Sequence, residues 1–358
     1  MTAAKKLLDR GVGTDLQRAS ILSGLCAATT LMARMQTALE LASQIIEVAE
    51  RQDDPTYRLV AYRMMGTNQY YAGQNREALA SLEHGKQYRD PRRQKTMSYR
   101  FGWDPSLSIL CFEVLVRLSL GLFDSAARLS EQIRADVNDH EHTTTVASAT
   151  FCASTWPEAM LGDLAALERD SATLSAYCAE RKVEQIRLLA NFHHAYAHAM
   201  REPLERNIIA LRAALNAIRS AGGLVGSSLM ISNLAEVSLM AGDLQRAEKD
   251  LQEGLSFVER SGENYWAADL HRLSGQLALR QRKSDSAERC FVKAIDIAKG
   301  QGARLLELRA AIDLARVWRE TRPERHPRSL LEPILAVIEG GESTRDVRNA
   351  RALLDRRA

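Results

Sequence analysis

Three histidines stand close together near the middle of the sequence, at His193, His194 and His198. The last two are four residues apart, which places both imidazoles on one face of a helix, a spacing that can hold a metal ion. No cysteine or carboxylate lies near enough in the sequence to complete a tetrahedral site. The pattern therefore favours surface or packing histidines, and neither a metal nor another cofactor is expected.

The chain shows no arrangement typical of a catalytic site. It lacks the G-x-x-x-x-G-K-[ST] loop of an ATPase, and no Ser-His-Asp, Cys-His or paired-carboxylate pattern stands out. The stretch AGGLVGSS, from Ala221, opens a helix and could hold an anion on its free amides. Because it has no lysine and follows no strand, a plain turn between helices is favoured. We expect a protein that binds and does not catalyse.

Two basic runs could meet an acidic partner or a phosphate, one in a loop and one in the tail. Their members are Arg89, Arg92, Arg93, Lys95 and Arg100 in the loop, and Arg345, Arg348, Arg351, Arg356 and Arg357 in the tail. The net charge is only +3, from 48 basic and 45 acidic residues, so the field outside the protein should be weak. Runs of this kind are usually solvated surfaces, and direct nucleic-acid binding is not expected.

The five cysteines lie far apart and contain no C-x-x-C pair, so neither a disulfide framework nor a zinc site is indicated. They are typical of buried thiols in a reducing cytoplasm. The N-terminal MTAAKKLLDRG has no apolar segment after its lysines, which argues against a secretory signal. The longest apolar stretch, 224–241, is interrupted by Ser, Asn and Glu, so no membrane contact is expected.

An internal repeat supplies the elements that must position any site. Its clearest unit, SNLAEVSLMAGDLQRAEKDLQEGLSFVERSG from Ser232, contains a helix, a turn at Gly242 and a second helix with Ala247 near its start. Glycine can end the first helix in the left-handed conformation, and a small alanine lets the second helix pack closely. Corresponding positions fall at 78, 126, 167, 247 and 287, a period of about 40 with a hidden unit at 184–220. The sequence therefore predicts an all-α fold of about eight helical pairs.

The whole chain, 1–358, is expected to form a single solenoid. The step from 78 to 126 is eight residues too long, and prolines at 91 and 105 bound the excess, which predicts an inserted loop at 89–104. Small residues at Gly66, Ala235 and Gly275, seven positions before the turn, mark where paired helices should cross. The segment TAAKKLLDRG reads as the end of a second helix whose partner is absent, and a capping helix is expected at about 344–356.

These anchors, with Asn233 and Leu234 ahead of Gly242, resemble the tetratricopeptide consensus, although the unit is longer than that family's usual 34 residues. The segments YRFGWDP, NYWAADLHRLSGQLALRQ and AERCFVKAIDIAKGQGARLLELRAAIDLARVWRE, with the LLEPIL and DVRNARALL tail, resemble the C-terminal region of large bacterial signalling ATPases. In those proteins such repeats follow a nucleotide-binding module, preceded by an adenylate cyclase or a winged-helix DNA-binding domain. The resemblance implies a right-handed superhelix that serves as the sensor or scaffold part.

In tetratricopeptide folds the first helix of each pair lines the concave groove, and the family's spacing before the turn selects the groove positions. Carried over to this chain, that spacing gives Arg63, Thr67, Tyr70, Tyr71, Cys152, Trp156, Phe192, Tyr196, Ser232, Glu236, Leu239, Met240, Arg272 and Gln276. Rigid aromatic side chains with flanking charges suit a peptide-binding surface. The alternative is that Trp156, Phe192 and Tyr196 fill the core, because an error of one residue turns a helical position by about 100°.

Three functions remain open from the sequence. The first is a repeat scaffold that binds a protein, a peptide or a small effector in a bacterial signalling or transcription-regulating system. The second is the C-terminal part of a nucleotide-dependent signalling enzyme, whose upstream ATPase or cyclase module would be the partner. The third is a structural scaffold or a homodimerisation module.

Overall fold

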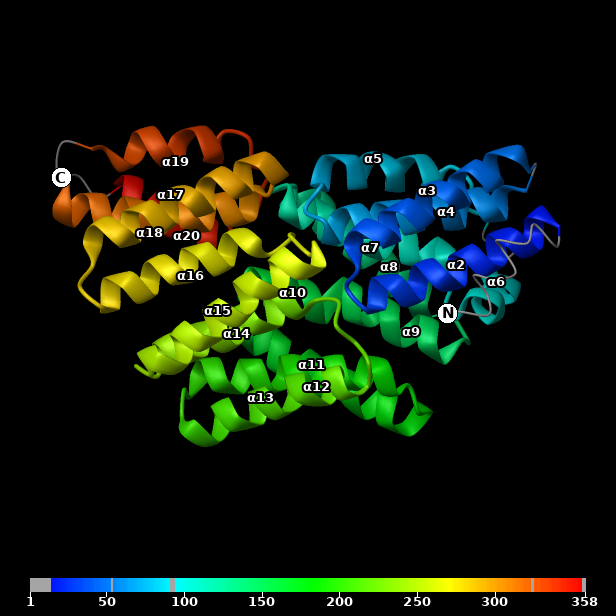
Figure 1. Cartoon of the computed structure of the whole chain (residues 1–358), viewed down its shortest axis with the longest axis horizontal. Helices are drawn as coiled ribbons and strands as arrows, with labels where there is room; N and C mark the ends of the chain where they lie inside the picture. Colours follow the sequence, from blue (N-terminus) through cyan, green and yellow to red (C-terminus); the bar gives the residue numbers. More distant parts are fainter. Residues whose placement is uncertain (1–13, 53, 91–93, 139, 323–324, 356–358) are drawn as a thin grey trace.

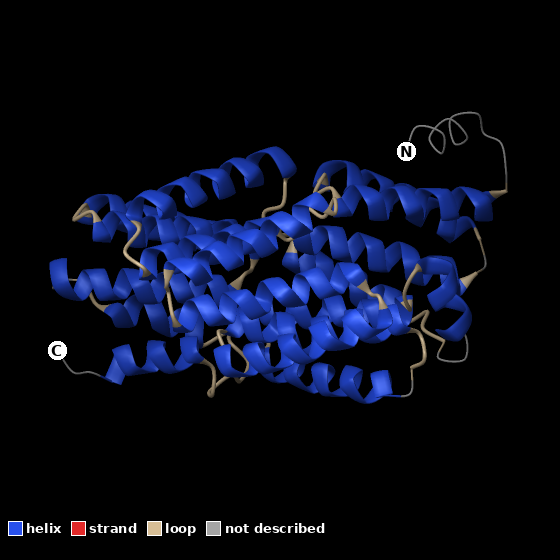
Figure 2. Ribbon diagram, turned by 90° about the horizontal axis from the view of Figure 1, so that it is seen from below, coloured by secondary structure: helices blue, strands red, loops and turns tan. Residues whose placement is uncertain are grey.

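The computed structural model describes residues 14–52, 54–90, 94–138, 140–322 and 325–355, and every regular element in them is a helix (Figure 2). Within these residues, all helices except α6 and α20 form eight antiparallel pairs, called pairs 1 to 8 in chain order. Their bounds are α2 (Asp15–Leu31) with α3 (Met35–Arg51), α4 (Pro55–Tyr71) with α5 (Asn75–Lys86), α7 (Pro105–Ser119) with α8 (Phe123–Asn138), α9 (Thr143–Thr150), the π-helix η2 (Phe151–Thr155) and α10 (Trp156–Leu161) with α11 (Leu164–Arg181), α12 (Glu184–Arg201) with α13 (Glu205–Ser220), α14 (Ser227–Met240) with α15 (Leu244–Ser261), α16 (Ala267–Arg280) with α17 (Ser284–Gln301), and α18 (Arg304–Thr321) with α19 (Pro327–Leu335).

The predicted fold class is confirmed, because the pairs stack into a tetratricopeptide-like right-handed superhelix. The hidden unit at 184–220 corresponds to pair 5, α12 and α13. Gly242 takes the left-handed conformation at its turn, with φ of 78°, and Arg282 takes it at the matching turn that has no glycine, with φ of 60°. The alanine that follows each of these turns is buried. The turn residue and the small residue identified in the sequence therefore occupy the structural positions expected of them in these repeats.

The small residues at the crossings of paired helices are sterically required. A Cβ atom added to Gly275 would lie 2.6 Å from the ring of Phe291 on the partner helix α17. The same addition at Gly66 would lie 2.6 Å from Leu82 on α5. Only a residue without a side chain lets these two pairs pack at their observed separation.

Two segments differ from the expected loop-and-pair pattern. The segment 89–104, expected as a loop, contains the short helix α6 (Gln94–Phe101), which packs on α7. The first helix of pair 4 is interrupted by the π-helical turn η2, in which all five residues are buried. At the other end α20 (Arg345–Asp355) packs on α18 and α19. The proposed helix end in TAAKKLLDRG lies outside the described residues.

Backbone hydrogen bonds close the superhelix on itself, and its N-terminal and C-terminal pairs lie beside each other in Figure 1. The backbone at the end of α2 bonds to residues 224 and 225 before α14, and the end of α4 bonds to residues 264 and 265 before α16. The end of α7 continues this series, since residues 121–124 bond to Glu339 and Gly341 after α19. The turns of pairs 1 and 2 therefore rest on the starts of pairs 6 and 7, and the turn of pair 3 rests on the segment that follows pair 8. The C-terminal pairs thus lie beside the N-terminal ones.

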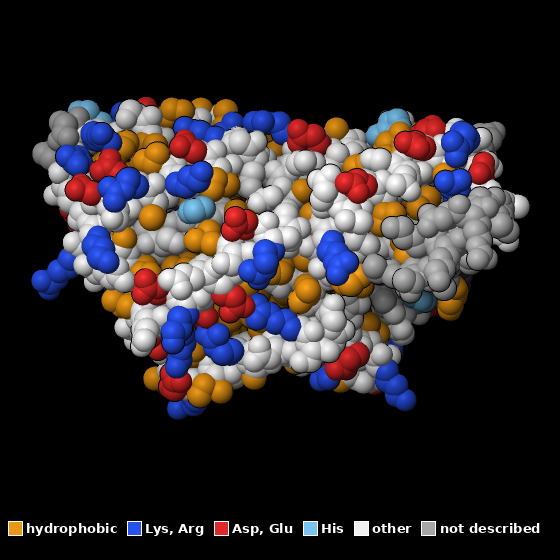
Figure 3. All heavy atoms as spheres, in the orientation of Figure 1, with side chains coloured by type: hydrophobic (Ala, Val, Ile, Leu, Met, Phe, Trp, Pro, Cys, Tyr) orange, Lys and Arg blue, Asp and Glu red, His pale blue; other side chains and the backbone are white. Residues whose placement is uncertain are grey.

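The core runs along the inside of the closed superhelix. The first helices of pairs 3 and 6, α7 and α14, are buried over nearly their whole length, whereas second helices such as α15 bury only one face. No helix in the described part of the chain is both long and apolar enough to cross a bilayer. On the face in Figure 3, basic and acidic side chains are interspersed, as the small net charge leads one to expect.

Candidate functional site

Apart from Tyr196, the predicted aromatic groove residues lie in the core, which corrects the expectation that they face a ligand. Tyr70 and Tyr71 at the end of α4 are buried against Tyr265, with ring centroids 5.2 and 5.4 Å apart. Trp156 is also buried, 6.3 Å from the Tyr70 ring. Phe192 is fully enclosed on α12. Because the closing turns bring pair 7 onto pair 2, these rings fill the space that an open superhelix would leave as a groove.

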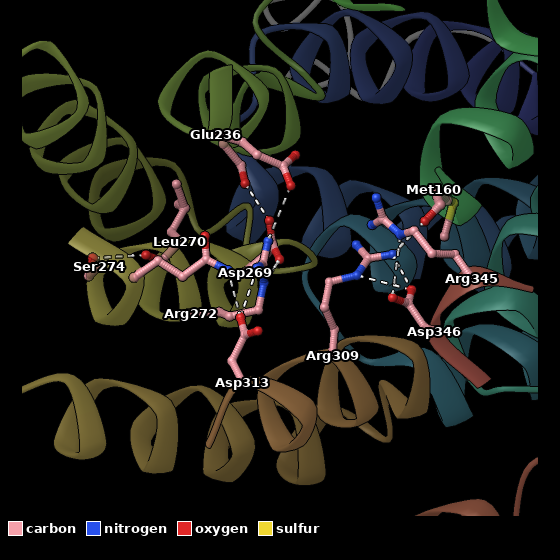
Figure 4. Close-up of polar contacts among 12 residues, drawn as sticks. Met160, Glu236, Asp269, Leu270, Arg272, Ser274, Arg309, Asp313, Arg345 and Asp346 are labelled. Carbon is pink, nitrogen blue, oxygen red and sulfur yellow. Dashed lines mark hydrogen bonds and ion pairs between the residues drawn. The ribbon is translucent and has the colours of Figure 1, made fainter. Parts of the chain in front are cut away.

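Five other predicted residues come together in a polar network on the inward side of pairs 5 to 8. We call it the concave polar strip, and it consists of Tyr196, Ser232, Glu236, Asp269, Arg272, Gln276, Asp313 and Arg316. Figure 4 shows four of them, Glu236, Asp269, Arg272 and Asp313. The strip crosses four successive first helices, α12, α14, α16 and α18. Positions one repeat apart meet there because the first helices stack directly on one another.

Arg272 is the centre of the strip. Its side chain is 5% exposed, and its guanidinium lies 2.6 Å from Asp269 and 3.1 Å from Asp313. A third carboxylate, that of Glu236, lies 3.8 Å away. Burial by itself would lower the pKa of Arg272, but the carboxylates of Asp269, Asp313 and Glu236 outweigh it and raise this pKa well above its ordinary value.

The carboxylate of Asp269 is ionised despite its burial. Burial alone would raise its pKa, but the charges of Arg272 and Arg309 outweigh burial and hold the pKa below its ordinary value. The Ser232 hydroxyl also donates to it at 2.6 Å. The inner part of the strip is thus a balanced set of opposite charges, held in one geometry by short hydrogen bonds.

The outer part of the strip reaches solvent. The side chain of Glu236 is 21% exposed while it accepts the Tyr196 hydroxyl at 2.8 Å. Gln276 is half-buried and donates to Asp313 at 2.7 Å, and Arg316, 51% exposed, reaches the other oxygen of Asp313 at 3.2 Å. Of the neighbouring groove predictions, Leu239 is buried and Met240 is exposed. The strip therefore presents an acidic, an amide and a basic group side by side.

A second ion pair fastens the end of the chain to the middle of the superhelix. Arg309 on α18 donates to Asp346 on α20 at 2.7 Å and to the Met160 carbonyl on α10 at 2.8 Å (Figure 4). Arg345, from the predicted basic tail, lies beside Asp346 at 3.8 Å. This contact joins pair 4, pair 8 and α20, and it therefore stabilises the closed superhelix.

The remaining predicted residues do not join the strip. Arg63 and Thr67 lie on α4, and Cys152 is buried in η2. In the basic loop, Arg100 packs over the rings of Tyr57 and Phe101, so it is engaged by its own chain. Described residues of the loop and the tail also include Arg89, Arg348 and Arg351, whereas Arg92, Arg93, Arg356, Arg357 and the side chain of Lys95 lie outside the described part.

The three predicted histidines are engaged by their own chain. His193 is buried, and burial lowers its pKa to about 4. The rings of His194 and His198 are 4.7 Å apart, and Glu168 lies 3.3 Å from His198. Within the described residues no group of three or more metal-binding side chains comes together.

The glycine-rich turn at 221–228 does hold an acidic group, and it is a side chain that the sequence analysis missed. Glu263 is fully buried and accepts the backbone amides of Gly226 and Ser228 and the Ser228 hydroxyl, at 2.7 to 2.9 Å. It therefore caps the start of α14 from the next loop. The sequence signal that could have indicated this contact is a carboxylate about one repeat after the glycine-rich turn.

Replacement of Glu263 by Gln is expected to reduce the free energy of unfolding by about 1–3 kcal/mol, because an amide nitrogen would face one of the buried donors. Burial raises the pKa of Glu263 from 4.5 to about 7. Between these pH values the folded state therefore holds a proton that the unfolded state has lost. The carboxyl's contribution is present in full below that window and lost as pH rises through it. Urea unfolding should show the gap between wild type and variant narrowing from pH 5 to pH 7, and a constant gap would contradict the assignment.

No known protein-family pattern matches the chain. A curated relative, an uncharacterized protein of Rhizobium meliloti (strain 1021), is 25% identical over 275 residues, which is 75% of this chain. The same match covers 26% of that protein, so this chain spans about a quarter of its relative's length.

Two solved structures share the fold. One is a Rap protein complexed with competence and sporulation factor, with a TM-score of 0.63, 10% identity, and coverage of 99% of this chain and 91% of that one. The other is the Rap conjugation gene regulator of the plasmid pLS20 in complex with the Phr* peptide, with a TM-score of 0.59, 8% identity, and coverage of 94% and 97%. At such identities these likenesses establish the superhelical fold alone.

Proposed function

We propose that this protein is a binding scaffold of a bacterial regulatory system, and that the concave polar strip takes an extended segment of a partner protein or a peptide. The observation that carries the proposal is the convergence of Tyr196, Ser232, Glu236, Arg272 and Gln276 from three stacked helices. Two similar folds are known in complex with a factor or a peptide. Both support a peptide or protein partner.

The strip determines what such a partner should offer. Glu236 would pair with a basic side chain, Arg316 with an acidic one, and the Gln276 amide with a backbone group. The exposed Met240 supplies apolar surface at the edge of the strip. The buried charges beneath, centred on Arg272, keep these groups in place, so little ordering is needed on binding.

Selection of short peptides from a random display library would test this proposal. Peptides that bind wild type are expected to lose about tenfold in affinity to Glu236→Gln, and a similar amount to Arg316→Gln, because each removes one exposed charge of the strip. The matched control is Glu253→Gln on the outer helix α15, which should leave affinity unchanged. The proposal would be refuted if the peptides bound Glu236→Gln and Arg316→Gln as tightly as they bind wild type.

A second candidate is supported by the match with the R. meliloti protein, since three quarters of that relative lies outside the matched region. In this interpretation the superhelix is the sensor part of a longer nucleotide-dependent signalling protein, with an ATPase or cyclase module as its partner. Mass spectrometry of the endogenous polypeptide would decide. A native protein of the mass calculated from this sequence would exclude the candidate.

A further inference from the structure

Arg63 is a half-buried guanidinium that has no carboxylate partner among the residues that the structure describes. It lies on α4, and its one hydrogen bond within the described residues runs from Nη1 to the Ser108 hydroxyl at 3.4 Å. Its Nε is buried and bonds to nothing in the described part of the chain. Burial lowers the pKa of Arg63 to about 10. A half-buried cation with no charged partner is unusual, because desolvated charges are normally paired.

The repeat provides an internal comparison. Arg63 stands ten residues before the left-handed residue of its turn, Gly73, and Arg272 stands ten residues before Arg282, which has the same conformation. In pair 7 this arginine is held by Asp269 at 2.6 Å and by Asp313 at 3.1 Å. The same position of the repeat thus has two internal carboxylates in one place and none in the other.

The missing carboxylates can be traced to the sequence, since the residue three before Arg63, where pair 7 has Asp269, is Val60. Asp313 comes one repeat after Arg272, and the residue at the corresponding position of pair 3, ten before Gly121, is Cys111. The side chain that Arg63 does reach, Ser108, carries a hydroxyl. Neither residue can neutralise a guanidinium.

A second polar group beside Arg63 also lacks a partner. The Thr67 hydroxyl lies one helical turn further along α4, is 6% exposed as a residue, and has no hydrogen bond in the described structure. Its counterpart in pair 7 is Gln276, which donates together with Arg272 to one oxygen of Asp313, at 2.7 and 3.1 Å. Arg63 and Thr67 therefore present two donors where pair 7 places an acceptor oxygen.

We propose that Arg63, Thr67 and Ser108 bind the carboxylate group of a ligand. This site lies between pairs 2 and 3, apart from the concave polar strip of pairs 5 to 8, and it does not depend on the function proposed for that strip. The ligand supplies the charge that Asp313 supplies in pair 7. A charge-assisted bond to the guanidinium and a neutral bond to Thr67 would satisfy both buried donors.

Titration of the whole protein with acetate, followed by the Nε–H signals of ¹⁵N-labelled arginine, tests this site. One signal should shift saturably with acetate and not with chloride at the same ionic strength, and Arg63→Gln should lack it. Thr67→Val keeps the shape of the side chain without its hydroxyl and should weaken acetate binding at least threefold. Arg316→Gln is the matched control and should leave the response unchanged.

Replacement of Ser108 by Asp would supply an internal carboxylate and should abolish the acetate response while raising the melting temperature. If that variant does not fold, Thr67→Val decides. N-acetyl-dialanine that binds more tightly than acetate would identify a peptide terminus, and equal binding would identify a small free carboxylate. Equal binding of the amidated dipeptide, tighter binding of inorganic phosphate, or a response unchanged in Thr67→Val would overturn the proposal.

Discussion

Replacement of Tyr265 by alanine is expected to lower the free energy of unfolding by about 3–5 kcal/mol. Tyr265 lies in the loop before α16, 3% exposed, and its ring packs on Tyr70 and Tyr71. Its backbone amide also donates to the Tyr71 carbonyl at 3.1 Å. The side chain therefore lies at the contact between pair 7 and pair 2. Its removal leaves a cavity that the surrounding aromatic rings cannot fill.

The matched control for this variant is Tyr99→Ala. Tyr99 lies on α6 and is 78% exposed, so its loss should change stability by no more than about 0.5 kcal/mol. Chemical denaturation followed by circular dichroism gives both values. If Tyr265→Ala unfolds at the same denaturant concentration as Tyr99→Ala, the closing contact between pairs 2 and 7 does not exist in solution.

Replacement of Arg272 by methionine is expected to lower the free energy of unfolding by about 3–5 kcal/mol at neutral pH. Methionine keeps much of the length of the side chain but leaves Asp269 buried without its nearest cation. Asp269 is 4% exposed, so water cannot take over the role of the guanidinium. The matched control is Arg316→Met, which removes a 51% exposed partner of the neighbouring Asp313 and should cost at most about 1 kcal/mol.

The pH dependence separates this charge effect from a packing defect. In wild type the pKa of Asp269 is held below its ordinary value of 3.8, so its ion pair stabilises the fold above that pH and stops doing so as pH falls through the folded pKa. Without Arg272, burial favours the protonated acid. The gap in stability between wild type and Arg272→Met should therefore be largest near pH 7 and narrow below pH 4. A gap that stays constant with pH would point to packing alone.

The repeat itself was predictable because it rests on local chemistry. A residue that can take the left-handed conformation ends the first helix, a small residue starts the second, and both recur every 40 or so residues. Gly242 and Ala247 show this most clearly, and the hidden pair at 184–220 followed from the period alone. The polar strip was also partly predictable. Ser232 and Arg272 stand ten residues before their turns, and Glu236 and Gln276 stand six residues before the same turns.

The closure of the superhelix was not predictable from the period. It depends on a small rotation between successive pairs, which accumulates until the turn of pair 1 meets the start of pair 6, almost 200 residues later. That rotation decides whether Tyr70, Tyr71 and Trp156 face a groove or a core. Without it, aromatic residues at groove positions were reasonably interpreted as contacts for a ligand.

The acidic partners were missed for a related reason. Asp269 and Asp313 carry no motif, and a chain with 26% charged residues offers many carboxylates at similar spacings. Glu263 is recognisable only once the loop before α16 is known to lie against the start of α14. Residues on the inner side of a repeat protein are best judged in pairs one period apart, as the contrast between Arg63 and Arg272 illustrates.

Hydrogen exchange of the protein with and without a selected peptide is the most direct test that the concave polar strip is the binding surface. The strip predicts slower exchange in the later turns of α14, α16 and α18, where Glu236, Gln276 and Arg316 lie, and unchanged exchange in the outer helices α3, α5 and α8. Protection confined to those outer helices would contradict it.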